Sequence, residues 1–259
     1  MTRIGLIQMQ CEKGAIAQNL ASIEAYMKEA ASRGVEILGF PEMSLTGYAD
    51  PQKYPQAVLR LDGPEIWQLL QMTKPYPTTV LIGLIEQNPG SKPFITQIVV
   101  RRGILEGCYR KITIQDEEVA WFSPGESARV FKWGGLTFGL AICADIDNEE
   151  VFAACGRQGA KLVFELAAPG LYGEQATRDW QSGYAWWEGE CQKYLSRNAQ
   201  QYGIWVGVAT QAGRTVDEDF PGGGFVFTPT GERMVATADW LPGAVYIDVD
   251  LESGRVVTI

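Results

Sequence analysis

The chain has 259 residues, of which 46% are hydrophobic and 20% are charged, and its formal net charge at pH 7 is −9. This composition is typical of a soluble globular protein, and the negative charge argues against binding to nucleic acid or anionic membranes, since both need basic patches. The absence of histidine excludes serine or cysteine catalysis through histidine, and histidine-ligated zinc or iron sites.

The N-terminus and the cysteines indicate a reducing compartment. The opening "MTRIGLIQMQ" lacks the features of a signal peptide, and no run of residues is long enough to span a membrane. The five cysteines are scattered without a CxxC pair, which favours free thiols and no structural zinc. We therefore expect a cytoplasmic protein, and nothing in the sequence indicates a metal or other cofactor.

Strand-like and helix-like segments alternate along the chain. The first half predicts strands at 3–10, 35–40, 78–86, 95–102 and 104–111, and helices at 15–34 and 61–72. The second half predicts strands at 136–143, 161–167, 204–210, within 223–238 and at 243–250, and helices at 148–160 and 180–202. Because no linker or repeat interrupts this alternation, we expect one α/β domain over residues 1–259, with no second domain after Ile259.

Three segments place reactive side chains at the ends of predicted strands. Glu42 follows a short buried strand, and Lys111 ends another, with Glu117 and Glu118 shortly beyond it. Cys143 ends a third strand, just before the N-terminus of a predicted helix. Taken singly, each residue more often has a structural role, and free cysteines are usually buried. A helix N-terminus and a nearby cation nevertheless stabilise a thiolate, which makes Cys143 the candidate nucleophile among the cysteines.

The ordered motifs resemble those of the carbon-nitrogen hydrolase family, also called the nitrilase superfamily. They are "IGLIQMQ", "FPEMSLTGY", "YRKITI", "FSPGE", "GLAICAD" and "GGFVFTPTGE". The resemblance covers nearly the whole chain and implies a four-layer αββα sandwich, commonly paired into a homodimer through helices. We expect the helix 180–202 and the helix after Cys143 to form that contact.

The resemblance also implies a Glu-Lys-Cys triad. Glu42, after "FP", is expected to be the general base, and Cys143, at the end of "GLAIC", the nucleophile. Lys111, after "YR", and the backbone N–H of Ala144 are expected to stabilise the oxyanion. The second glutamate of the family corresponds to Glu118, with Glu117 as the close competitor, and is expected to orient Lys111 or to hold the substrate's amide nitrogen.

The implied activity is hydrolysis of a small linear amide or carbamoyl compound through a cysteine thioester, with release of ammonia or an amine. Two alternatives remain: a nitrilase that makes an acid through a thioimidate, and a glutaminase-like or non-catalytic partner subunit. The segment "CADIDNEE" departs from many relatives, because Ala144 replaces an aromatic residue and arginine and proline are missing. Thr113 also stands where many relatives have histidine.

Several aromatic residues are expected at the substrate entrance and favour a neutral or aromatic amide. The predicted substrate contacts are Tyr48, Trp121 and Tyr172, with Tyr54 and Trp180 as further candidates for the entrance.

Overall fold

Two mixed sheets, each with a parallel centre, organise the chain. The computed structural model describes residues 1–259. The first sheet has eight strands: β16 (Val256–Thr258), β15 (Gly243–Val249), β1 (Thr2–Gln8), β2 (Ile37–Gly39), β4 (Thr79–Glu86), β5 (Phe94–Arg101) and β6 (Ile104–Arg110) in spatial order, with β3 (Val58–Leu59) paired to β4. The second has six: β14 (Arg233–Ala236), β13 (Phe225–Phe227), β10 (Trp205–Thr210), β9 (Leu162–Ala167), β8 (Leu136–Ile142) and β7 (Val130–Trp133).

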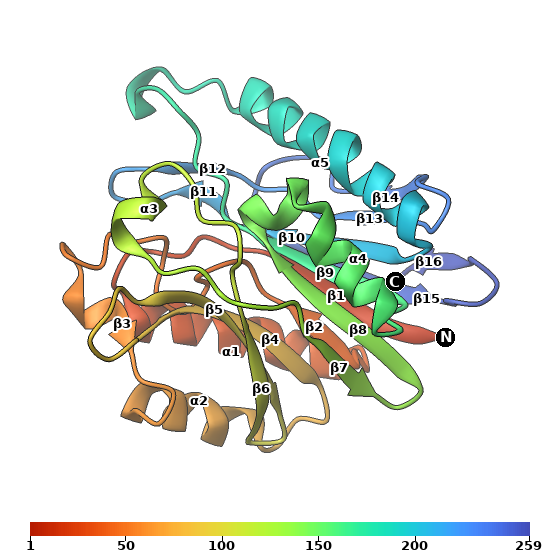
Figure 1. Cartoon of the computed structure of the whole chain (residues 1–259), viewed down its shortest axis with the longest axis horizontal. Coiled ribbons are helices and arrows are strands. Elements are labelled where there is room, and N and C mark those ends of the chain that lie inside the picture. Colours follow the sequence, from red (N-terminus) through yellow and green to blue (C-terminus); the bar gives the residue numbers. More distant parts are fainter.

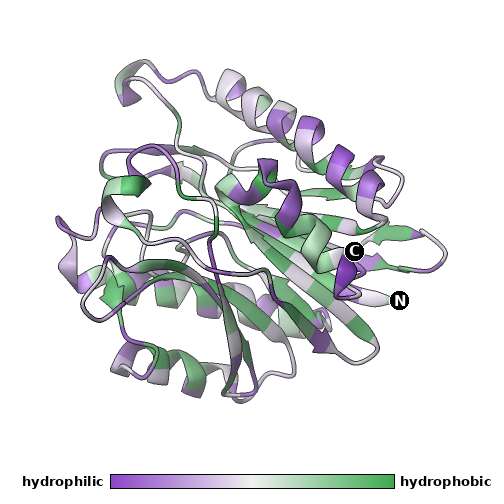
Figure 2. Ribbon diagram, in the orientation of Figure 1, coloured by the Kyte–Doolittle hydropathy of each residue, from purple (hydrophilic) through white to green (hydrophobic).

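Helices cover the outer face of each sheet. Figure 1 shows α1 (Ile16–Ser32) and α2 (Pro64–Thr73) on one side of the molecule, and α4 (Glu149–Arg157) and α5 (Trp180–Tyr202) on the opposite side. On α1, the buried Leu20, Ile23 and Met27 recur at helical spacing and pack on the first sheet. Hydrophobic residues are concentrated in the strands, whereas the outer surfaces of the helices are largely hydrophilic (Figure 2). The predicted four-layer αββα fold is therefore confirmed.

The two sheets pack closely, and the carboxyl ends of their parallel strands meet at one edge. A Cβ on Gly207 of β10 would lie 3.2 Å from a Leu6 side-chain carbon of β1, so small residues allow the sheets to approach. Met9 and Gln211, just beyond β1 and β10, form a parallel bridge between the sheets. Ligand sites in open α/β sheets commonly lie beyond the carboxyl ends of the strands, which directs attention to this edge.

The short elements are those that the sequence pattern did not predict. They are β3, β7, β16, the pair β11 (Ala212–Arg214) and β12 (Asp219–Pro221), the single-turn helix α3 (Glu118–Trp121) and the 3-10 helices η1 (Pro55–Ala57), η2 (Cys143–Asp147) and η3 (Gln175–Thr177). Such segments have too few residues for a periodic pattern. None of the helices combines the length and apolarity that crossing a membrane requires.

Candidate active site

Glu42 lies just beyond the carboxyl end of β2 and is fully buried. Both of its carboxylate oxygens have partners, because Lys111 Nζ donates to Oε1 at 2.9 Å and the backbone N–H of Ala168 donates to Oε2 at 3.0 Å. The side-chain amide of Gln211 donates to the Glu42 main-chain carbonyl at 2.8 Å. Since Ala168 and Gln211 follow β9 and β10, the second sheet holds in place a carboxylate that the first sheet carries.

The backbone around Glu42 passes directly over Gly83 of β4. A Cβ on Gly83 would lie 2.3 Å from the backbone nitrogen of Met43 and 2.7 Å from the carbonyl oxygen of Pro41. Gly83→Ala must therefore displace this segment. We expect it to lower the free energy of unfolding by about 2 kcal/mol, since overpacking typically costs about 1–3 kcal/mol. Urea unfolding measures the change.

A glycine with free space around it provides the matched control. At Gly189 of α5 an added Cβ meets no neighbour within 4 Å, and alanine favours a helix over glycine. Gly189→Ala should therefore be neutral or stabilising, and equal stabilities of the Gly83→Ala and Gly189→Ala variants would contradict the close-approach argument.

Lys111 directly follows β6, and its ammonium group bridges two glutamates. Besides its bond to Glu42, Lys111 Nζ donates to the two Glu118 oxygens at 2.7 and 2.9 Å. The side chain of Lys111 is only 1% exposed, and those of Glu42 and Glu118 are 0% and 4% exposed. Removing one member of such a buried group leaves a charge unpaired, which is strongly destabilising.

The single turn of α3 directs Glu118, and not Glu117, toward Lys111. Glu118 is buried, whereas Glu117 is exposed. The hydroxyl of Tyr48 donates to Glu118 Oε1 at 3.0 Å. Of the two glutamates that the sequence left open, the ion pair with Lys111 is thus made by Glu118, and Tyr48 holds that carboxylate from the other side.

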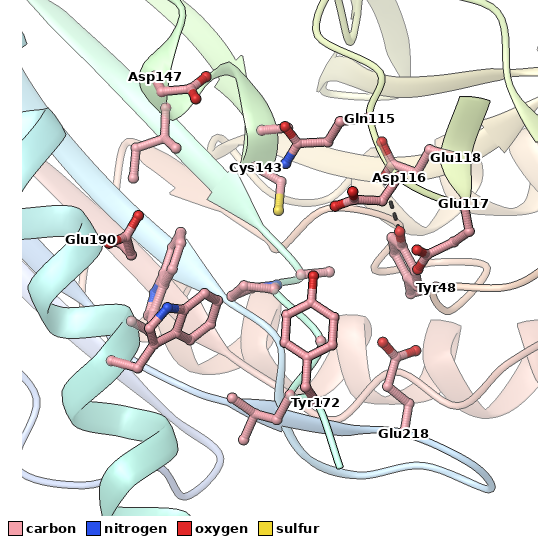
Figure 3. A pocket seen from close by; sticks show the side chains of 18 of the residues that line it. Tyr48, Gln115, Asp116, Glu117, Glu118, Cys143, Asp147, Tyr172, Glu190 and Glu218 are labelled. Atoms are coloured by element: carbon pink, nitrogen blue, oxygen red, sulfur yellow. Dashed lines mark hydrogen bonds between the residues drawn. The ribbon is translucent and has the colours of Figure 1, made fainter.

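Cys143 is the first residue after β8 and begins η2. Its backbone φ is +46°, in the left-handed region that residues other than glycine seldom adopt. Figure 3 shows its sulfur pointing into a cavity between the labelled side chains. Backbone strain of this kind costs about 1–3 kcal/mol and is concentrated at functional sites.

Asp145 fixes the turn that presents Cys143. Its Oδ2 accepts hydrogen bonds from the backbone N–H of Ile142 at 3.1 Å and from the hydroxyl of Tyr109 at 2.6 Å. Its Oδ1 accepts from the backbone N–H of Thr113 at 2.8 Å. Asp145 therefore ties the Cys143 turn of one sheet to β6 and the residues that follow it in the other. Asp145 was not predicted as a site residue from the sequence.

Glu165 is a further buried carboxyl near the Cys143 turn. It stands on β9 opposite Ala141 of β8, is 0% exposed, and neither side-chain oxygen has a hydrogen-bond partner. Burial raises the pKa of Glu165 well above its usual value, and the carboxylates of Asp145 and Glu42 raise it further. The Glu165 carboxyl therefore favours its protonated, uncharged form more strongly than an exposed glutamate does.

Burial also shifts the pKa values of Cys143, Glu42 and Lys111. It raises the pKa of the Cys143 thiol well above its usual value, and the Glu42 carboxylate raises this pKa further, while Lys111 lowers it. Burial raises the pKa of Glu42 to about 7, against the opposing effect of Lys111. Burial lowers the pKa of Lys111, but Glu42 and Glu118 overcome this and raise it well above its usual value. The arrangement is a neutral thiol beside an ammonium and a carboxyl poised to exchange a proton near neutral pH.

A cavity of about 270 Å³ opens above the Cys143 thiol. Its wall includes Tyr48, Ala144 and Tyr172, all singled out from the sequence. From α5 it also includes Trp186, Trp187, Glu190 and Tyr194, which the sequence analysis did not assign to a site. No group of three or more histidine, cysteine, aspartate or glutamate side chains is arranged to hold a metal ion.

Three aromatic residues expected at the entrance lie elsewhere. The ring of Trp121 packs edge-on against Phe122, with centroids 6.3 Å apart, and contacts the hydrophobic core. Tyr54 precedes η1 and lies beside Gly14. Trp180 stands at the start of α5, with the guanidinium of Arg214 6.0 Å from its ring centroid. None of these three residues is therefore part of the cavity wall.

The chain is similar in sequence and structure to known carbon-nitrogen hydrolases and amidases. A family model for carbon-nitrogen hydrolases matches residues 3–258. Omega-amidase NIT2 of Homo sapiens is 27% identical over 263 residues, which cover 96% of this chain and 89% of the amidase. A glutamine-dependent NAD(+) synthetase of Thermotoga maritima is 27% identical over 265 residues, which cover 99% of this chain. The crystal structure of an amidase from Nesterenkonia sp. has a TM-score of 0.80 at 24% identity, covering 100% of this chain and 90% of that chain.

The extent of these matches differs between the relatives. The chain spans about half the length of several curated relatives, including 43% of the Thermotoga maritima synthetase. The match to the Nesterenkonia amidase shows a common fold. Because the family model extends over almost the entire chain, this protein belongs to the carbon-nitrogen hydrolase family.

Proposed function

We propose that the protein hydrolyses the C–N bond of a small linear amide or carbamoyl compound through a thioester on Cys143. The observation that carries this proposal is the Lys111 ammonium, which is held between the buried carboxylates of Glu42 and Glu118 beside the cavity that receives the Cys143 thiol. Family membership and amidases among the relatives and structural neighbours support amide hydrolysis in general.

Acylation begins with proton transfer from the Cys143 thiol to Glu42. The sulfur attacks the amide carbon, and the carbonyl oxygen becomes an oxyanion. Lys111 and the backbone N–H of Ala144 stabilise this oxygen. An ammonium group has three protons, and Lys111 has three carboxylate contacts, so it exchanges one of its two contacts with Glu118 for the oxyanion. Glu42 then gives its proton to the leaving nitrogen, which departs as ammonia and leaves the acyl group on sulfur.

Deacylation follows the same steps, with water as the nucleophile in place of the Cys143 thiol. Glu42 takes a proton from a water molecule, the hydroxide attacks the thioester carbon, and the same two donors stabilise the second oxyanion. The C–S bond breaks and the sulfur regains its proton from Glu42. The balance is one amide and one water consumed, and one carboxylic acid and one ammonia released.

A nitrile is the rival substrate for the same thiol. Purified protein should be incubated with matched amide and nitrile pairs, with ammonia and the acid product quantified. The proposal expects turnover of the amide at a rate well above that of the nitrile with the same carbon chain. Faster turnover of the nitrile would indicate that the protein is a nitrilase and not an amidase. The proposal would be refuted if neither substrate were turned over and mass spectrometry showed no acyl adduct on Cys143.

A glutaminase-like function is a second candidate, favoured by one observation. The glutamine-dependent NAD(+) synthetase of Thermotoga maritima aligns with 99% of this chain. The protein is then a unit that releases ammonia from glutamine for a second active site. Including L-glutamine in the amide panel distinguishes the two, because this candidate predicts glutamine as the preferred amide.

The raised pKa of Glu42 predicts the pH dependence of catalysis. The carboxyl must be ionised to take the thiol proton, so kcat/KM should decline on the acid side with a midpoint near pH 7.

The raised pKa of Glu42 also affects stability. The folded state holds the Glu42 proton more tightly than the unfolded chain does, where glutamates titrate at about pH 4.3. The stabilisation from Glu42 is therefore fully present below that pH and is lost as the pH rises through about 7.

A second carboxyl in the cavity provides the control for this profile. Burial also raises the pKa of Glu218, which lines the same cavity. Glu42→Gln should abolish the acidic limb along with most of the activity, whereas Glu218→Gln should retain the limb. If the acidic limb disappeared in Glu218→Gln, the titrating carboxyl would be Glu218, and its assignment to Glu42 would be wrong.

A further inference from the structure

The cavity above Cys143 has an excess of negative charge. Four of the carboxylates in its wall form neither an ion pair nor a hydrogen bond: Asp116, Glu117, Asp147 and Glu190. Lys111 is the only cationic side chain of the wall, and its charge is already shared between Glu42 and Glu118. A ligand in this cavity therefore meets several carboxylates that form no ion pair with the protein.

Of these four carboxylates, Glu190 has the surroundings most suitable for binding a cation. It is half-buried, whereas Asp116, Glu117 and Asp147 are exposed, so solvent screens its charge least. On α5 it lies four residues after Trp186 and four before Tyr194, and side chains at this spacing share a helix face. All three line the cavity. A carboxylate beside aromatic rings is a favourable site for an ammonium, because the ring face also attracts cations.

Asp147 faces the same region from the end of η2. The side-chain amide of Asn198 donates to the carbonyl of Ile146 at 3.0 Å, which fixes η2 against α5. Figure 3 shows Asp147 and Glu190 on one side of the Cys143 sulfur, and Asp116 and Glu117 on the other. The nearest basic residue on α5, Lys193, bonds to the hydroxyl of Tyr194 at 2.9 Å and not to Glu190. Glu190 and Asp147 thus remain available to a ligand.

We propose that the amide substrate carries an ammonium group at the end remote from the scissile bond, bound by Glu190 and Asp147 against Trp186. This inference rests on the proposed function. A carboxylate at that end would be repelled by the same groups, and a neutral group would gain nothing from them. A cavity of about 270 Å³ lies just below the range of about 300–1,000 Å³ for small-molecule sites, so the substrate is a short amino amide. The aromatic residues alone had favoured a neutral amide; the carboxylates beside them change that expectation.

Three amides of matched length test the proposal: δ-aminovaleramide with an ammonium end, hexanamide with a methyl end and glutaramate with a carboxylate end. We expect kcat/KM for δ-aminovaleramide to exceed that for hexanamide by about tenfold or more, with glutaramate lowest and the preference reduced by added salt. Glu190→Gln should remove most of this preference, mainly through KM. An equal or better rate with hexanamide or glutaramate would overturn the proposal.

Asp116→Asn is the matched control, because it removes the same charge from the opposite side of the cavity. It should reduce the preference by less than about threefold, since Asp116 is exposed and well screened. If Asp116→Asn removed the preference as fully as Glu190→Gln, the assignment to Glu190 would be wrong.

Binding to an inactive variant separates this inference from the proposed function. Calorimetry on Cys143→Ala should show tighter binding of δ-aminovaleramide than of hexanamide, and this difference should disappear in Cys143→Ala/Glu190→Gln. If no amide is hydrolysed but the difference in binding remains, the proposed function fails and the ammonium site stands. Equal binding of the two amides overturns the ammonium site whatever the enzyme hydrolyses.

Discussion

Cys143→Ala is expected to lower kcat for amide hydrolysis by at least about 10⁴-fold, because removing a nucleophile that acts together with its partners costs up to about 10⁶-fold. The side chain lines the cavity and is only partly buried. Alanine meets the same backbone constraint at φ +46°, so the fold should survive. Ammonia release measures the activity, and urea unfolding with circular dichroism measures the stability.

Another cysteine distinguishes the loss of a nucleophile from the loss of a packed thiol. Cys155 of α4 is fully buried, and a Cβ on Gly139 of β8 would lie 2.5 Å from its sulfur. Cys155→Ala should therefore lower stability by about 1 kcal/mol or more through the space it leaves, while turnover remains within a few-fold of the parent. If Cys143→Ala retained activity within tenfold, the thioester mechanism would be wrong.

The positions of Glu42, Lys111 and Cys143 follow from features that the sequence carries. Glu42, Lys111 and Cys143 each follow a recognisable strand, and β2, β6 and β8 deliver them at one edge of the molecule. Buried strands are among the clearest patterns in a sequence. The four-layer fold and the roles of these residues were implied by the resemblance that the ordered motifs carry. In the structure Lys111 and Cys143 line the cavity, and Glu42 bonds to Lys111 behind them.

The contacts that orient the triad were beyond sequence reasoning. Glu42 is held by the backbone N–H of Ala168 and the side chain of Gln211, and a backbone donor has no residue type to recognise. Asp145 appeared as one acid among several in "CADIDNEE", although three hydrogen bonds converge on it. Such contacts join positions more than a hundred residues apart in the chain or across two sheets, and they depend on the final packing.

The residues of the cavity wall were equally difficult to predict from the sequence. Trp121 and Trp186 are both aromatic residues near the motifs, yet only Trp186 lines the cavity. The difference arises from local geometry: α3 is a single turn whose tryptophan packs on Phe122, whereas α5 is long enough to present a regular face. The expected homodimer through α4 and α5 stays a prediction, since contacts within one chain do not test it.

Lys111→Met is expected to impair both activity and stability. Loss of an oxyanion donor typically lowers kcat by about 100- to 1000-fold. Methionine preserves much of the side-chain volume but leaves Glu42 and Glu118 buried without a cation, and breaking a buried ion pair costs about 3–5 kcal/mol. Lys132 is exposed and has no ion pair, so Lys132→Met should change the free energy of unfolding by less than about 0.5 kcal/mol.

The pH dependence of the stability loss in Lys111→Met tests whether the loss comes from the missing charge. The ammonium lowers the pKa of Glu42, so without it the Glu42 carboxyl stays protonated to a still higher pH in the folded variant than in the folded parent. The folded state then binds more protons, and stability falls as the pH rises. The loss relative to the parent should therefore be larger at about pH 8 than at about pH 5. Lys111→Met/Glu118→Gln should recover part of the stability but none of the activity, because one buried charge is removed while the oxyanion donor is still missing. A loss that is the same at both pH values and unchanged in the double variant would instead indicate a packing defect.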